Sequence, residues 1–377
     1  MKRLLIYLLS VAALTTACRQ DSPIPKEEAA VHHAASAAKK KVKTAYGFDE
    51  EIRLKTTPVK NQGHSALCWA YAMLATIETE HLMQGDSVNL SADFVARQFL
   101  KEQTMAYRRG DEITTRGIAP MLIRLIQTYG LTHFDAYHAR GAWSEERGAK
   151  RDPSLNYNIL CNKLEQLATF NQRNLSVREG KAEELLDREI GPAPRFVFML
   201  GAEYTTLEFA HSVCRQDEYE SLTSFTHHPF NQPFVLEVPD NHYRDLFLNV
   251  PLDTLMQRLD DALRAGHPVC WEGDTSEPGF SFAHGIAHLQ HERQTVTQAR
   301  RQHSFEMGYT TDDHCMEIVG IAYRRIKGGK PGVRRPSAKY YIMKNSWGTG
   351  NPYGGYMYVS ENYVRLKTLA LILPREL

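Results

Sequence analysis

The sequence predicts an α+β fold, because helix-forming and strand-forming segments both stand out along the chain. An unbroken helix-forming stretch begins at Cys68 and continues to about Gly85, which suits a helix C-cap. A second helix is predicted where leucine and methionine recur at helical spacing between residues 252 and 263, before Gly266 ends the pattern. Buried strands are predicted where β-branched and apolar residues follow one another, at 269–271, 316–321, 340–344, 355–359 and 368–373.

The bulk composition bounds the size of the fold and the class of partner. With 377 residues, of which 42% are hydrophobic, the chain can bury the core of a large two-lobed domain. Its 45 basic and 44 acidic residues leave a formal net charge of +1 at pH 7. A nearly neutral chain has no overall field that would attract nucleic acid or an anionic membrane. We therefore expect no nucleic-acid partner and infer the function from individual sites.

The first 18 residues are typical of a bacterial export signal. Two basic residues precede an apolar run at positions 4–14, which is too short to span a membrane stably. Cys18, directly after small residues, resembles the lipobox of bacterial lipoproteins, in which that cysteine is lipidated and becomes the mature N-terminus. The alternative is an ordinary signal peptide that is cut after Ala17. Both interpretations place the protein in the cell envelope, and the first anchors it to a membrane through its N-terminal lipid only.

Residues 19–46 are predicted to form a flexible tether between this signal and the folded domain, residues 47–377. The stretch is rich in Ala, Lys, Glu and His and has almost no large apolar side chains, so it cannot build a core. It is also too short and too polar for a folded inhibitory pro-segment. We therefore expect no large propeptide.

The cysteines and most histidines do not form a recognisable metal or redox motif. The six cysteines are scattered, without a CxxC pair. Weaker candidates for metal ligands are His227 with His228, and the group of His284, His288 and His291. The interval between His284 and His288 contains a glycine and no glutamate, so a solvated loop is favoured. The sequence predicts neither a metal nor a cofactor.

Cys68 is the strongest candidate for a nucleophile, because it stands at the start of a long, apolar helix. The positive end of the helix dipole and the free N–H groups of the first turn stabilise a thiolate, which is the attacking species. Gln62, six residues upstream, could present its side-chain N–H beside the backbone N–H of Cys68, and two such donors would hold an oxyanion. Taken alone, Cys68 is equally well explained as a buried structural cysteine.

His314 and Asn345 supply the other groups that a thiol nucleophile needs. His314 stands at the entrance of a predicted buried strand, where its imidazole could pair with the thiolate and protonate a leaving amine. Asn345 precedes a glycine-rich turn, and its amide oxygen could orient the imidazole while Trp347 shields their hydrogen bond from water. Cys315 is interpreted as a buried strand residue that faces away from the base, since side chains alternate along a strand.

The order and local context of these residues resemble the papain superfamily of cysteine peptidases. Its motifs are matched by the glutamine and the Cys-Trp pair around Cys68, by His314, and by Asn-Ser-Trp-Gly from Asn345. The resemblance implies a helical lobe built on the Cys68 helix, an antiparallel, barrel-like lobe that carries His314 and Asn345, and a cleft between the lobes. Ser65 stands where the family has a cysteine, so the disulfide formed there in papain-like enzymes is expected to be absent.

Within this superfamily, the chain resembles the bleomycin hydrolase and aminopeptidase C family from about residue 47 to 370. The 246 positions between Cys68 and His314 exceed by about a hundred the interval in a compact papain-like enzyme, which indicates a large helical insertion at about 140–265. The segments that carry the likeness begin with Tyr204-Thr205-Thr206-Leu207-Glu208-Phe209, His228-Pro229-Phe230-Asn231, Gly266-His267-Pro268-Val269-Cys270-Trp271-Glu272-Gly273-Asp274 and Thr310-Thr311-Asp312-Asp313-His314-Cys315-Met316.

The resemblance implies a peptidase that attacks peptides or proteins through Cys68, most simply as an aminopeptidase. The family's long C-terminal arm, whose carboxylate holds the substrate's amino terminus, is expected to be missing or vestigial here, because the sequence ends 32 residues after Asn345. Endopeptidase and dipeptidyl-peptidase action therefore stay open. The further alternatives are a catalytically silent peptide-binding homologue and an enzyme that uses the same groups on cell-wall peptides or conjugated amino acids.

Overall fold

The computed structural model describes residues 47–138, 156–199, 201–324 and 338–376, all within one compact unit. The predicted signal peptide (1–18) with its lipidation residue Cys18, and the predicted tether (19–46), lie outside the described residues. Among the helices that are described, none is both long and apolar enough to cross a membrane.

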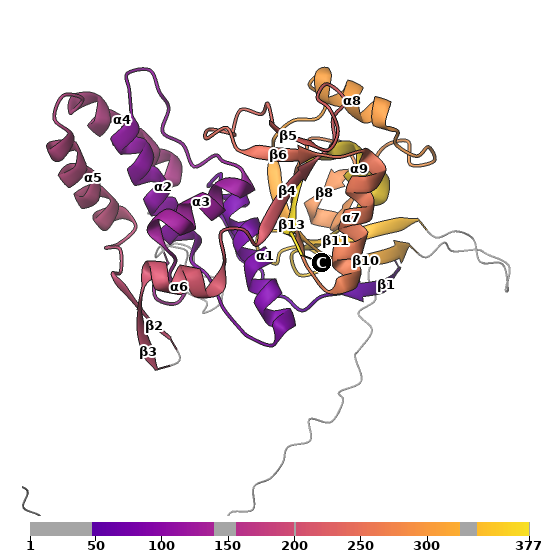
Figure 1. Ribbon diagram of the computed structural model, residues 1–377, viewed down its shortest axis with the longest axis horizontal. Coiled ribbons are helices and arrows are strands. Elements are labelled where there is room, and N and C mark those ends of the chain that lie inside the picture. The colour runs from indigo at the N-terminus through magenta and orange to yellow at the C-terminus, as the bar shows by residue number, and fades with distance from the viewer. Residues whose placement is uncertain (1–46, 139–155, 200, 325–337, 377) are drawn as a thin grey trace, which may run out of the picture. The chain divides into compact units, whose positions relative to one another are not determined.

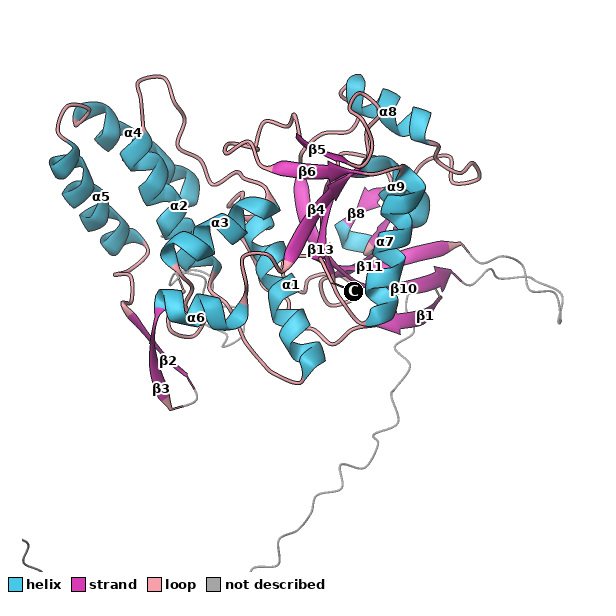
Figure 2. Ribbon diagram, viewed as in Figure 1, coloured by secondary structure: helices cyan, strands magenta, loops and turns pink. Residues whose placement is uncertain are grey.

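The described helices fall into two groups, one gathered to one side of the main sheet, which it meets through α1, and one beside the sheet itself (Figures 1 and 2). The first group contains α1 (Cys68–Gln84), α2 (Ala92–Ala106), α3 (Ala119–Tyr129), α4 (Tyr157–Phe170), α5 (Leu175–Glu189) and α6 (Thr206–Val213). The second group contains α7 (Leu252–Ala265), α8 (Gln298–Glu306) and α9 (Glu361–Lys367). The helical lobe predicted from the Cys68 helix corresponds to the first group.

The second lobe is built on a large, mostly antiparallel sheet. Its strands are β1 (Phe48–Arg53), β4 (Tyr219–Thr223), β5 (Gln232–Val235), β6 (Leu246–Asn249), β7 (Val269–Gly273), β8 (Phe280–Ser281), β9 (Ile286–Ala287), β10 (His314–Arg324), β11 (Lys339–Lys344), β12 (Tyr356–Ser360) and β13 (Thr368–Pro374). In the described residues they follow the order β5-β6-β4-β13-β7-β10-β11-β12-β9-β8, and β1 adds to β10. A separate hairpin of β2 (Phe196–Met199) and β3 (Ala202–Thr205) lies beside α6.

The central strands of this sheet are buried on both faces, and side-chain alternation assigns each residue to one face. Cys270 of β7 and Cys315 of β10 belong to the apolar cluster formed with α1 to α6. Trp271 and Met316, the next residue along each strand, belong to the second cluster, which includes the apolar face of α7. Because α1 packs against β7 and β10, the start of the helix is held against the start of β10.

The two predicted helices and their glycine stops are confirmed. Helix α1 runs from Cys68 to Gln84, and Gly85 adopts the left-handed conformation with φ 92° that ends it. Helix α7 ends in the same way at Gly266, with φ 98°. Strands β7 and β10 to β13 occupy the runs predicted for buried strands.

The region expected to hold a helical insertion, about 140–265, contains α4 to α7 but also β2 to β6. Strands β4 and β6 join the main sheet, because β4 pairs with β13 near the C-terminal end of the chain. That pairing joins segments about 150 residues apart in the sequence, so local periodicity gives no sign of it. The insertion therefore contributes to both lobes.

Candidate active site

Cys68 is the first residue of α1 and lies at the interface between this helix and the sheet. No side chain caps the helix at Leu67, so the first-turn N–H groups are left for other acceptors. Residue 68 is only 9% exposed and lines a pocket. Trp69, directly after it, anchors the helix start by donating from Nε1 to the carbonyl of Thr115 at 2.9 Å.

The thiol of Cys68 is stabilised as a thiolate by its neighbours. The pKa of Cys68 is held well below its ordinary value. The largest cause is a hydrogen bond from the Cys315 thiol. Together with a hydrogen bond and the positive charge from His314, it outweighs the opposite effect of burial. The dipole of α1 acts in the same direction, because its positive end points at the sulfur. A low thiol pKa is the property that a catalytic cysteine needs and that a structural cysteine lacks.

On the side of its ring away from Cys68, His314 is hydrogen-bonded to Asn345. His314 is the first residue of β10 and is 3% exposed, and Asn345 directly follows β11. Ring atom Nε2 lies 2.8 Å from Oδ1 of Asn345, and because an amide oxygen can only accept, Nε2 carries the proton. Nδ1 is thereby left to face Cys68. The backbone N–H of Ser346 donates to the same Oδ1 at 2.7 Å and fixes the amide.

Trp347 covers the imidazole and itself contacts two phenylalanines. Its ring centroid lies 4.5 Å from that of His314. Phe282 and Phe280 approach the indole edge-on, with centroids 5.4 Å and 6.0 Å away. This aromatic packing keeps water from the His314–Asn345 hydrogen bond, which strengthens it. Neither phenylalanine was singled out from the sequence, because Phe280 in β8 and Phe282 directly after this strand lie far from any motif.

Gln62 is held so that its amide nitrogen faces the nucleophile segment. Its Oε1 accepts from the hydroxyl of Ser346 at 2.5 Å, and its backbone N–H donates to the carbonyl of Ser346 at 2.8 Å. Nε2 donates to the carbonyl of Ser65 at 2.7 Å, which uses one of its two N–H groups. Gln62 and Cys68 line the same pocket, so the second N–H can meet an oxyanion formed beside the sulfur.

The pocket at Cys68 measures about 220 Å³ and has an acidic wall that the sequence did not reveal. Asp240 and Asp312 line it together with Arg116. Arg116 donates from Nε to Asp240 at 2.8 Å and from Nη2 to the backbone carbonyl of Asp312 at 3.1 Å. These three residues come from separate segments and belong to no motif, so no local pattern points to them.

Cys315 is buried in β10, as the sequence predicted, but it also contacts the nucleophile. Its side chain lies on the helix-facing side of the strand, opposite to that of His314. Burial and the hydrogen bond to Cys68 raise the pKa of Cys315 well above its ordinary value, so this thiol stays protonated and acts as a donor. All cysteines in the described part of the chain are free.

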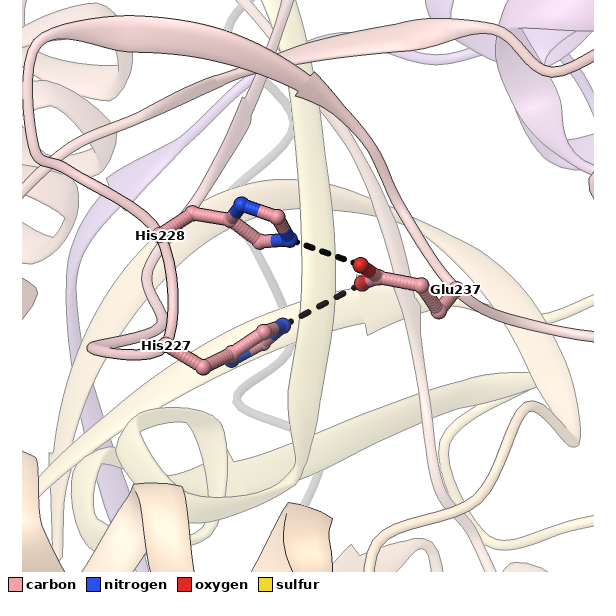
Figure 3. Close-up of side chains that lie close together, drawn as sticks. All are labelled: His227, His228 and Glu237. Atoms are coloured by element: carbon pink, nitrogen blue, oxygen red, sulfur yellow. Dashed lines mark hydrogen bonds and ion pairs between the residues drawn. The ribbon is translucent and has the colours of Figure 1, made fainter.

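The described residues bring together one group with metal-ligating atoms, away from Cys68. Glu237 accepts from Nε2 of both His227 and His228, at 3.2 and 2.7 Å (Figure 3). Gln302 donates to Nδ1 of His227 at 2.9 Å, and its orientation is set because its oxygen accepts from the N–H of Thr226. The proton of the neutral His227 ring is therefore on Nε2, where a metal would need a lone pair. The cluster is satisfied as hydrogen bonds.

Comparison with solved structures bears on the fold. The chain is similar to PepW from Lactobacillus rhamnosis, with a TM-score of 0.63, 16% identity and coverage of 87% of this chain and 82% of that chain. Xylellain, a cysteine protease from Xylella fastidiosa, gives a TM-score of 0.44 at 13% identity over 88% of this chain and 87% of its own. Bromelain protease from Ananas comosus gives 0.37 at 15% identity, over 85% and 93%. No family model and no curated protein matches the sequence.

The chain has a papain-like α+β fold, which it shares with PepW. The resemblance drawn from the sequence motifs is thereby confirmed at the level of the fold. Identity of 16% carries no further than the fold, so the chemistry has to be argued from the site itself.

Proposed function

We propose that the protein is a cysteine peptidase in which Cys68 is the nucleophile, His314 the general base and acid, and Asn345 the orienting residue. The observation that carries this assignment is the continuous chain from the Cys68 thiol to the His314 ring and, at 2.8 Å, to Oδ1 of Asn345. A structural cysteine has no use for a buried imidazole held in one tautomer at a helix start. The papain-like fold supports the assignment.

The steps of the reaction follow from these contacts. The Cys68 thiolate attacks the peptide carbonyl, and the Gln62 side chain and the Cys68 backbone N–H donate to the oxyanion. The C–N bond then breaks as His314 gives its proton to the departing amine, which leaves a thioester on Cys68. Neutral His314 next takes a proton from water, whose oxygen attacks the thioester. The carboxylic acid is released and the thiolate is restored.

We further propose that the substrate is a peptide cleaved at its amino-terminal end, as in the aminopeptidase C family that the motifs resemble. The pocket at Cys68, about 220 Å³ with an acidic wall, supports an exopeptidase because a charged amino terminus suits that wall. Endopeptidase and dipeptidyl-peptidase action are the outcomes against which this is tested.

The test is cleavage of one peptide series, with free and N-acetylated termini, by the purified domain and its Cys68→Ala variant. Stepwise release of single residues from free peptides, lost in the variant, is the expected result. Cleavage of acetylated peptides would replace the exopeptidase by an endopeptidase. If neither kind of peptide is cleaved in a Cys68-dependent way, then the peptidase assignment fails and a peptide-binding protein or a hydrolase of conjugates takes its place.

The cell-envelope location is part of the same proposal. Residues 1–18 would direct export, Cys18 would carry the lipid, and residues 19–46 would tether the domain to the membrane surface. Expression of the full chain and of Cys18→Ser, followed by detergent phase partitioning, tests this. Loss of the detergent-phase form in the variant is expected, whereas an aqueous wild type would favour the ordinary signal peptide cut after Ala17.

A further inference from the structure

A second thiol lies against the proposed nucleophile, and the peptidase reaction does not use its sulfur chemistry. Cys315 is the second residue of β10, and its side chain hydrogen-bonds to that of Cys68. Both cysteines line the pocket of about 220 Å³. In the proposed reaction Cys68 bonds to the substrate, whereas Cys315 only donates a hydrogen bond. That donation does not require a sulfur atom, because a serine hydroxyl could supply it.

The fold holds the two thiols in contact. Helix α1 packs on β10, and Cys315 belongs to the apolar cluster formed on the helix-facing side of the sheet. Trp69 anchors the start of α1 by donating to the carbonyl of Thr115 at 2.9 Å. Strand β10 runs between β7 and β11 in the sheet. Both sulfur atoms therefore lie on anchored elements, so the contact belongs to the folded protein and not to a moving loop.

The two thiols differ in protonation, which suits them to different steps of an oxidation. Hydrogen bonds from Cys315 and His314 hold the pKa of Cys68 well below its ordinary value, which favours the thiolate. Burial, followed by the hydrogen bond to Cys68, raises the pKa of Cys315 well above its ordinary value, so this thiol stays protonated. Hydroperoxides react with thiolates and much less with thiols. Cys68 is therefore the sulfur that is oxidised first, beside a thiol that can respond.

A third cysteine on the same face of the sheet provides a comparison. Cys270 of β7 is opposite Glu317, two positions along β10 from Cys315, so the two cysteines are diagonal neighbours. Burial raises the pKa of Cys270 well above its ordinary value, and its side chain hydrogen-bonds to Thr76. Cys270 is not among the residues that line the pocket at Cys68. It is therefore a matched control, a thiol on the same face that is not part of the pocket.

We propose that Cys68 and Cys315 form a reversible disulfide when the protein meets a hydroperoxide, which switches the site off and protects Cys68 from irreversible oxidation. This inference goes beyond the proposed peptidase reaction, because it needs the two thiols and an oxidant but no peptide. The cell-envelope location proposed above would expose the pair to oxidants.

The oxidation takes place in two steps. The Cys68 thiolate attacks one oxygen of hydrogen peroxide and the O–O bond breaks, which makes Cys68 a sulfenic acid; the departing hydroxide takes the proton of the His314 imidazolium and leaves as water. The Cys315 sulfur then attacks the sulfenic sulfur, the S–O bond breaks, and the hydroxide leaves as water with the proton of the Cys315 thiol. The two sulfurs have lost two electrons, which reduce the peroxide. A dithiol reverses the bond by exchange and becomes a disulfide itself.

The test detects the new bond by mass spectrometry. The reduced full chain is treated with hydrogen peroxide, its remaining thiols are blocked with N-ethylmaleimide under denaturing conditions, and it is digested with trypsin without a reductant. Trypsin releases residues 61–97 and 302–324, which contain Cys68 and Cys315 as their only cysteines. The expected product is these two peptides joined, with the loss of two hydrogen atoms, and dithiothreitol should separate them. Cys270 should carry N-ethylmaleimide.

The variant Cys315→Ser separates the oxidation from the hydrogen bond, because a hydroxyl can still donate to Cys68 but cannot form a disulfide. After peroxide and then dithiothreitol, the wild type should regain its starting activity. Cys315→Ser should regain at least about 10-fold less of its own starting activity, because its sulfenic acid continues to the sulfinic acid. Peptide mapping should find that sulfinic acid on Cys68, a readout independent of activity. Cys270→Ser should recover as the wild type does.

Three results from the wild type overturn the disulfide. They are a sulfinic acid on Cys68 beside a blocked Cys315, a Cys68 that peroxide leaves unmodified, and a bond from Cys68 to another cysteine. The peptidase assignment is decided separately, because the joined peptides are detected whether or not a peptide substrate is cleaved. Absence of Cys68-dependent cleavage would therefore remove the peptidase while the joined peptides keep the disulfide.

Discussion

Two buried glutamates near helix α1, Glu78 and Glu272, differ in whether a cation is paired with them. Glu78 lies ten residues after Cys68, about 15 Å along the helix, and is 0% exposed. Lys60 donates to its Oε1 at 2.5 Å, and the N–H of Leu90 donates to the same atom at 2.6 Å. At the other end, Glu272 is equally buried but has only a 3.5 Å contact with a backbone N–H.

The difference teaches which buried charges are structural. Burial raises the pKa of Glu78, but the charges of Lys60 and Lys344 and its hydrogen bonds outweigh this, so its pKa is lowered and the carboxylate is ionised. No comparable cation counters burial at Glu272. A buried carboxylate that is paired with a cation, as at Glu78, stabilises the fold, whereas an unpaired one, as at Glu272, costs stability. Changes near Cys68 should affect activity, and changes near Glu78 should affect stability.

The largest effect is expected for His314→Ala, which should lower kcat/KM by about 10³- to 10⁴-fold because both proton transfers are lost. The urea midpoint should change far less than it does for Glu78→Gln. Steady-state kinetics and urea unfolding measure the two quantities. His211→Ala, at an exposed position of helix α6, is the control. Retention of more than about a tenth of the activity would remove His314 from the mechanism.

The next largest effect is expected at Glu78, which is paired with Lys60. Glu78→Gln should reduce the free energy of unfolding by about 3–5 kcal/mol, because Lys60 is left buried without its counter-charge. Urea denaturation measures this. Glu51→Gln breaks the half-exposed pair with Arg264 and should cost less than about 1 kcal/mol. Equal losses in the two variants would mean that burial does not distinguish them.

A smaller effect on activity is expected at Asn345, which acts through the imidazole and not on the substrate. Asn345→Ala should lower kcat by about 10- to 100-fold with little change in KM, since the ring is still present but no longer fixed in one tautomer. The pH profile of kcat should also shift, which a purely structural residue would not cause. A change confined to KM would contradict the positioning role.

The smallest effect expected is the pH dependence that Asp312 gives to the free energy of unfolding. Because the folded-state pKa of Asp312 is raised to about 8 from 3.8, its contribution is complete below pH 3.8 and is lost as pH rises through about 8. Asp312→Asn should remove this contribution, so its free energy of unfolding should fall less between pH 4 and pH 9 than that of the wild type. Urea midpoints between pH 4 and 9 measure it, with Asp217→Asn for comparison. Parallel curves for Asp312→Asn and the wild type would show that Asp312 is already ionised.

The sequence predicted those parts of the fold that local sequence patterns determine. The helix from Cys68 to Gly85, the helix that Gly266 ends, and strand β10 all follow from periodicity and stop signals. It did not predict strands β4 to β6 within the insertion, because β4 is stabilised by pairing with β13 at the far end of the chain. The visible signal of the pair of Glu78 and Lys60 was Glu78 within an apolar helix, but nothing local named Lys60 as its partner.

The residues of the site also divide into those that local motifs predicted and those that they did not. Gln62, Cys68, His314 and Asn345 lie in short motifs, and the structure brings all four together with Trp347. The acidic wall was missed because its contacts join distant segments, as when Arg116 bonds to Asp240, 124 residues away. The contact between Cys315 and Cys68 was also missed, since strand alternation predicts which way a side chain faces but not what packs against it.

The thiolate at Cys68 is tested most directly by its rate of alkylation with iodoacetamide as a function of pH, followed by mass spectrometry of the Cys68 peptide. A lowered pKa predicts that Cys68 still reacts well below pH 8, where an ordinary thiol is protonated, and that His314→Ala moves its profile upward. The free cysteines Cys161 and Cys214, whose pKa values burial raises, serve as internal references that should stay unmodified. A Cys68 profile centred near pH 8.5, or no reaction at all, would contradict the assignment of Cys68 as the nucleophile.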